Sequence, residues 1–111
     1  MMDAEQAKAE LSDWWREQAE TEIEMVVGKA IEYGARDLKV MGHELAAMAG
    51  REVDDQEAAE LGCAMYLAGK MARVTAAFAE GRLPSLDTYL DIGIYTRMVQ
   101  RIREKGGWPG V

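Results

Sequence analysis

Residues that interrupt helices are sparse in this 111-residue chain, and they stand mainly between long segments of helix-forming residues. Its only two prolines are Pro84 and Pro109, and Ala, Glu, Leu and Met dominate the rest. These four residue types have high helix propensity. No segment shows the alternation of apolar and polar residues that is typical of a half-buried strand. The sequence therefore predicts an all-α fold, a bundle of about four to five helices.

A chain of this length suits one domain, residues 1–111, with a modest hydrophobic core. Residues that favour helix N-caps precede three of the expected helices. They are Ser12-Asp13, Asp54 with Glu57 three residues later, and Ser85. The segments with helical periodicity are about 14–33, about 36–49, about 56–80 and about 86–104.

The net charge of the chain limits the classes of ligand and partner that it is expected to bind. Acidic residues outnumber basic ones by 20 to 13, which gives a formal net charge of −7. This balance disfavours contact with a phosphate backbone, so direct nucleic-acid binding is not expected. Divalent cations, or nucleotides held through a metal, suit it better. No apolar run approaches the roughly 20 residues that span a membrane, and the N-terminus does not resemble a signal peptide. We expect a cytoplasmic protein without membrane contact.

Single copies of the two most reactive side-chain types exclude several kinds of site. Cys63 is the only cysteine and His43 is the only histidine. An internal disulfide is impossible, and a zinc site or a Cys-His-Asp triad has too few residues to draw on. Because Cys63 lies in an Ala- and Leu-rich segment, we interpret it as a small buried hydrophobic residue.

Four carboxylates fall on the apolar stripes of the last two expected helices when residues are placed at 100° intervals. Glu57 and Glu60 share the stripe of Leu61, Ala64, Ala68, Met71, Ala72, Thr75 and Phe78. Asp87 and Asp91 continue the stripe of Ile94, Tyr95, Met98 and Ile102. We expect both stripes to face the core. Carboxylates are costly to bury alone, so these four predict nearby cations, hydrogen-bond donors or a metal.

Packing of the two helix starts against each other would bring the four acids together around a hard divalent cation, typically Mg²⁺. Helix-start roles are the competing explanation for two of them. Glu57 completes a capping box, and Asp87 lies in a first turn, where an acid favours the helix dipole. Glu60 and Asp91 lie deeper. For Asp91 the competing explanation is an ion pair with Lys70, Arg73 or Lys29.

Two further surfaces carry candidate binding residues. The segment 56–80 has a second face that carries Gly62, Tyr66, Gly69, Lys70 and Arg73. Its two cations are candidates for pairing with phosphate, and a solvated basic edge is the alternative. The first long segment has an apolar stripe of Trp15, Ala19, Ile23, Val26 and Ala30. We expect its tryptophans to pack in a core or an interface.

Short motifs between residues 29 and 95 resemble a known family. Gly69-Lys70-Met71-Ala72-Arg73 and the later Asp87-Thr88-Tyr89-Leu90-Asp91-Ile92-Gly93-Ile94-Tyr95 resemble the K-x-x-R … D-x-(aromatic)-x-D-[IL]-x-x-Y signature of small phage-borne MazG-like proteins. These belong to the all-α nucleoside triphosphate pyrophosphohydrolase superfamily. Lys29 and Tyr33-Gly34 resemble the K-x-x-x-Y-G element of the same proteins.

The resemblance implies a Mg²⁺-dependent pyrophosphohydrolase that acts on nucleoside triphosphates, forms a homodimer or homotetramer, and works in the cytoplasm, that of the host if phage-encoded. Family members hold the metal with an E-x-x-E pair and an E-x-x-D pair. Glu57 and Glu60 fit the first pair; in the second, Thr88 replaces the glutamate and Asp91 is the aspartate. The implied metal ligands are Glu57, Glu60, Asp87 and Asp91, with Glu60 and Asp91 catalytic. The implied nucleotide-binding residues are Lys29, Tyr33, Lys70, Arg73 and Tyr95.

A second hypothesis follows from the Thr88 substitution and the small size of the chain. The protein would be a non-catalytic helical module that binds nucleotides or a protein partner, and its acids would be neutralised by nearby cations. The two hypotheses differ in the placement of Glu60 and Asp91. They lie within metal-bridging reach of each other in the enzyme, and each meets its own Lys or Arg in the module. A third idea, an acidic DNA mimic, is disfavoured because mimicry needs acids on an outer surface.

Overall fold

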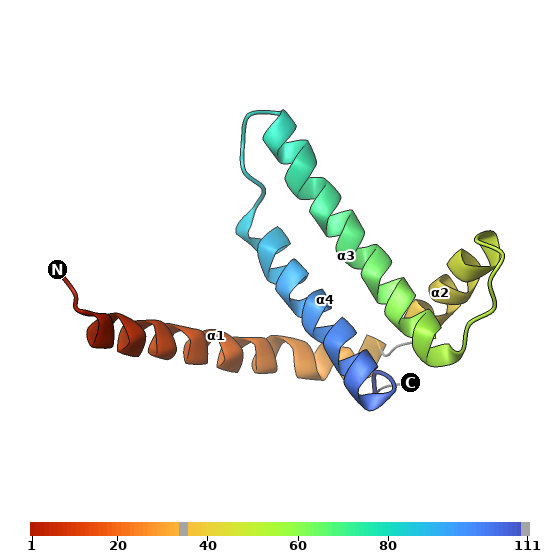
Figure 1. Ribbon diagram of the computed structural model, residues 1–111, viewed down its shortest axis with the longest axis horizontal. Coiled ribbons are helices and arrows are strands. Elements are labelled where there is room, and N and C mark those ends of the chain that lie inside the picture. Colours follow the sequence, from red (N-terminus) through yellow and green to blue (C-terminus); the bar gives the residue numbers. More distant parts are fainter. Residues whose placement is uncertain (34–35, 110–111) are drawn as a thin grey trace.

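The computed structural model describes residues 1–33 and 36–109, except for the side chains of residues 29–33 and 36. This part of the chain contains no strand and four helices: α1 (Ala4–Tyr33), α2 (Arg36–Met48), α3 (Asp55–Ala79) and α4 (Leu86–Lys105) (Figure 1). The predicted all-α fold is therefore confirmed. No helix in the described ranges is long and apolar enough to cross a lipid bilayer.

Helix α1 begins ten residues earlier than the sequence predicts. The backbone N–H of Gln6 donates to Asp3 Oδ1 at 2.8 Å, and the backbone N–H of Asp3 donates to Gln6 Oε1 at 3.0 Å. This reciprocal pair satisfies two N–H groups at the helix start, as a capping box does. The predicted cap at Ser12-Asp13 was wrong, because the reciprocal Asp3–Gln6 cap stands upstream and no helix-breaking residue lies between the two positions.

Helices α2 and α3 cross with their backbones in close contact. A Cβ atom built on Gly42 of α2 would lie 1.7 Å from the carbonyl oxygen of Ala58. A Cβ atom built on Gly62 of α3 would lie 2.1 Å from the carbonyl oxygen of Leu38. Each helix thus contributes a glycine that faces the backbone of the other. Only residues without a side chain permit this approach.

Helices α3 and α4 form an antiparallel hairpin, and the core lies where α2 and the start of α3 meet the end of α4 (Figure 1). Cys63 and Ile102 are the largest fully buried side chains of the described chain, and Leu38 and Ala59 complete the cluster. Beyond α4, Gly106 adopts a left-handed conformation with φ of 79°. The tail then returns, and Trp108 packs against this cluster.

One side of α3 has no neighbouring helix among the residues that the structure describes. Ala58 and Gly62 face α2, while Cys63 and Lys70 contact α4. The remaining side, here called the uncovered side of α3, is exposed at Ala68, Met71, Ala72, Thr75 and Phe78. Phe78 keeps 75% of its surface exposed. The prediction that this stripe faces the core was wrong within one chain, because α3 packs through its other two sides.

Helix α1 makes only marginal contact with the other described helices and extends away from the hairpin (Figure 1). Trp15 and Ile23, on its predicted apolar stripe, are 62% and 61% exposed. The chain exposes 8360 Å², whereas a compact monomer of 12.3 kDa exposes about 6,100 Å². Its radius of gyration is 17.1 Å, against about 13 Å for a compact domain of this length.

Candidate functional site

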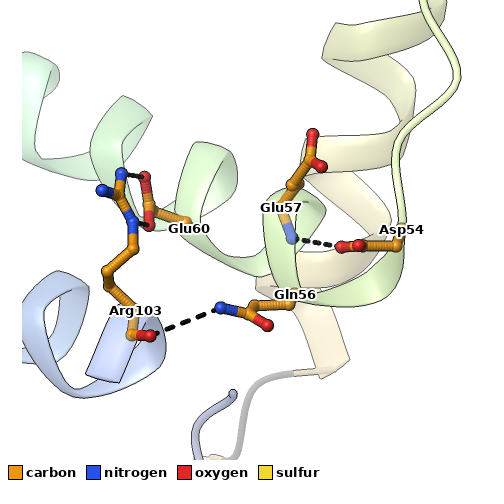
Figure 2. A network of polar contacts seen from close by, with 5 residues as sticks. All are labelled: Asp54, Gln56, Glu57, Glu60 and Arg103. Atoms are coloured by element: carbon orange, nitrogen blue, oxygen red, sulfur yellow. Dashed lines mark hydrogen bonds and ion pairs between the residues drawn. The ribbon is translucent and has the colours of Figure 1, made fainter. Parts of the chain in front are cut away.

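Glu60 lies in an ion pair that joins the start of α3 to the end of α4 (Figure 2). Its two carboxylate oxygens accept hydrogen bonds from Arg103 Nε at 2.6 Å and Nη2 at 2.5 Å. The backbone carbonyl of Arg103 accepts a third bond, from Gln56 Nε2 at 3.4 Å. Hydrogen bonding to Arg103 lowers the pKa of Glu60 below its ordinary value. Bidentate pairs of this kind are strong and fix geometry, so Glu60 acts here as a tie between two helices.

Glu57 belongs to the cap of α3. Its backbone N–H donates to Asp54 Oδ1 at 2.8 Å, which confirms Asp54 as the N-cap. Its carboxylate is directed away from that of Glu60 (Figure 2). Its carboxylate pairs with Arg51, whose Nη2 lies 4.0 Å from Glu57 Oε2, and the Glu57 side chain is 58% exposed. Glu57 and Glu60 therefore lie close together along α3, but their carboxylates do not point at one shared position where they could hold the same ion (Figure 2).

Lys70, Asp91 and Tyr95, three of the residues that carry the family resemblance, meet in the seam between α3 and α4. Lys70 Nζ lies 3.0 Å from Asp91 Oδ2. The rings of Tyr66 and Tyr95 stack, with centroids 5.7 Å apart and planes within 5° of parallel. Burial raises the pKa of Tyr95. One of the three cations proposed for Asp91 is thus its partner.

Beneath this seam lies Cys63. Its thiol donates to the backbone carbonyl of Tyr95 at 3.5 Å. Burial raises its pKa to about 11, so the thiol stays protonated at neutral pH. This agrees with a packing role, since the thiolate is the reactive form.

The antiparallel hairpin keeps the two pairs of acids apart. Glu60 is level with Arg103 near the end of α4, and Asp91 is level with Lys70. Ten residues separate Glu60 from Lys70, which is about 15 Å along a helix. The described residues contain no group of three or more His, Cys, Asp or Glu placed to hold a metal ion. Because Mg²⁺ requires several oxygens around one point, the acids of one chain do not fit it.

The other predicted site residues stand apart from these pairs. Asp87 is exposed in the first turn of α4, and Arg73 is exposed on α3. The side chains of Lys29 and Tyr33 lie outside the described residues.

The sequence reasoning missed Gln56 and Arg103, the residues that join α3 to α4 beside Glu60. A short loop between two helices favours an antiparallel pair. Such a pair sets the start of the first helix beside the end of the second, so the loop at Pro84 was a readable signal for a basic partner in the last turn.

Comparisons of the chain with protein families, with curated proteins and with solved structures found no match. The family resemblance in the sequence therefore stays a prediction.

Proposed function

We propose that this protein is a non-catalytic helical module that acts by binding another polypeptide through apolar helix sides. The observation that carries the proposal is the bare apolar surface of α1 and α3. The chain exposes about 2,300 Å² more than a compact monomer of its mass. This excess counts polar and apolar surface together, and its apolar part includes the exposed side chains of Trp15, Ile23 and Phe78. Exposed apolar surface on the sides of helices favours a protein partner.

The polar contacts support a structural role for the deeper acids. Glu60 has Arg103 and Asp91 has Lys70, so each carboxylate already has its own cation. Both pairs join α3 to α4. This is the arrangement that the sequence associates with the module hypothesis.

The test is an assay of the purified chain with a panel of NTPs and dNTPs and Mg²⁺. We expect no release of monophosphate or pyrophosphate. We also expect the same melting temperature in Mg²⁺ and in EDTA, because a cation that bound only the native state would raise it. Turnover that Asp91→Asn abolishes and that Asp13→Asn, an exposed acid of α1, leaves intact would refute the module.

A nucleotide pyrophosphohydrolase is the second candidate, and one observation favours it. Lys70, Asp91 and Tyr95 match the family signature and meet in one seam. In this reading the phosphates would contact Lys70, and Arg73 would be a second cation. A full set of metal-binding acids would then need contributions from two chains. Turnover in the same assay, lost on Asp91→Asn, is the result that would establish it.

A further inference from the structure

We infer that the partner is a second copy of this chain, with α1 of each copy covering the uncovered side of α3 in the other. The inference rests on the proposed function, since it takes these apolar surfaces as the binding surfaces. A homodimer is among the assemblies that the family resemblance implies, and the structure adds which two surfaces would pair.

The two surfaces match in length and are opposite in side-chain size. On α1 the stripe is formed by Leu11, Trp15, Ala19, Ile23 and Val26, over about 22 Å of helix. On α3 the apolar side runs from Leu61 to Phe78, about 26 Å. The α1 stripe carries a tryptophan, whereas α3 offers Ala64, Ala68 and Ala72 between its larger residues. Large residues on one helix fit between small residues on the other.

The exposed area agrees with an obligate dimer. An excess of about 2,300 Å² per chain becomes about 4,600 Å² for two chains. Obligate homodimer interfaces bury about 2,000 to 5,000 Å². The excess surface is therefore of the size that such a dimer interface buries. Exchange of an identical element between two protomers is a low-cost route to a closed two-fold dimer.

Charge also favours this pairing. Residues 4–28 of α1 contain seven acidic and two basic side chains. The last part of α4 carries Arg97, Arg101, Arg103 and Lys105 against the single acid Glu104. This basic part of α4 is level with the start of α3, where Arg103 pairs with Glu60. An α1 helix laid on the hairpin therefore meets opposite charge at the Leu61 end of the apolar side, which favours placing acidic residues of α1 at that end.

The experiment measures molar mass by light scattering during size exclusion. The intact chain is expected at 24.6 kDa, twice its 12.3 kDa. Trp15→Asp and Phe78→Asp, on the two proposed surfaces, should shift it to 12.3 kDa. Thr21→Asp and Ala76→Asp add the same charge to other sides of the same helices and should leave the dimer. All four positions are exposed, so each variant keeps its helix content by circular dichroism.

A cross-link identifies which helices meet. Chains with Trp15→Cys are mixed with chains with Ala68→Cys and oxidised, while the native Cys63 is buried. A disulfide-linked heterodimer is expected. A dimer that never forms this cross-link overturns the pairing of α1 with α3. A chain that stays at 12.3 kDa at every concentration overturns the second copy as partner. If Trp15→Asp also lowers the melting temperature of that monomer, α1 packs against its own chain instead. Neither result bears on the nucleotide assay, which tests the proposed function separately.

Discussion

Replacement of Gly62 by alanine tests the backbone contact between α2 and α3. The new Cβ atom would lie 2.1 Å from the carbonyl oxygen of Leu38, and real Cβ atoms essentially never approach closer than 3.0 Å. The two helices must therefore separate by at least about 0.9 Å, the difference between these distances. The obstructing atoms belong to backbone, so no side-chain rotation relieves the contact.

Two opposing terms set the size of the effect. Overpacking of a tight interface costs about 1–3 kcal/mol, and sometimes more. Alanine regains up to about 1 kcal/mol over glycine within a helix. We expect a net loss of about 1–2 kcal/mol in the free energy of unfolding. For a domain of this size, that lowers the melting temperature by roughly 5–15 °C.

Gly69→Ala is the matched control, because it makes the same change in the same helix. A Cβ atom at Gly69 meets nothing within 4 Å, so only the gain in helix propensity remains. We expect it to stabilise the chain by about 0.5–1 kcal/mol. Urea denaturation followed by circular dichroism measures both variants. If Gly62→Ala proves as stable as Gly69→Ala, the close approach of the helices is not real and the reasoning fails.

Three further predictions follow from the described contacts. Arg103 lowers the pKa of Glu60 from the ordinary 4.5, so this pair stabilises the fold above that pH and the stabilisation is lost as pH falls through the lower pKa of the folded state. Glu60→Gln should therefore weaken the dependence of the unfolding free energy on pH in the acid range. An unchanged pH dependence would contradict this. The thiol of Cys63, with its pKa raised to about 11, should react with a thiol reagent at neutral pH only after denaturant is added, and rapid labelling of the native chain would show that the thiol is accessible. Asp54→Ala should cost about 1 kcal/mol in urea denaturation, since it removes the N-cap bond to Glu57, whereas Asp54→Ser should retain most of it.

Local features were predictable where one short segment decides them. Asp54 is the N-cap of α3, and Gly106 ends α4 in a left-handed conformation. Both depend on residues within one turn of the helix end. The predicted start of α1 was wrong for a local reason too. Asp3 and Ser12-Asp13 are both suitable N-caps, and the sequence alone does not show which of them begins the helix.

Tertiary contacts were less predictable. A helical wheel shows which residues share one side of a helix, but it does not show which other helix, if any, packs against that side. The wheel grouped Glu60 with Phe78 on one apolar side and expected that side to be core. In the structure Glu60 bonds to Arg103, 43 residues away, while Phe78 is exposed. Lys70 was named beforehand as a partner of Asp91, since charge and depth limited the choice to a few cations. Which side of α3 would lack a neighbour depends on the paths of α1 and α2, which periodicity does not encode.

The crossing of Gly42 and Gly62 has a consequence for how the chain opens. Neither residue has side-chain rotamers to lose when the helices meet, so the contact forms without that entropic cost. It also has no flexible group that could keep partial contact as the helices part. Helix α2 and the first half of α3 should therefore exchange their amide hydrogens as one cooperative unit. In a single chain the amides of α1, which has no such joint, should exchange independently and earlier.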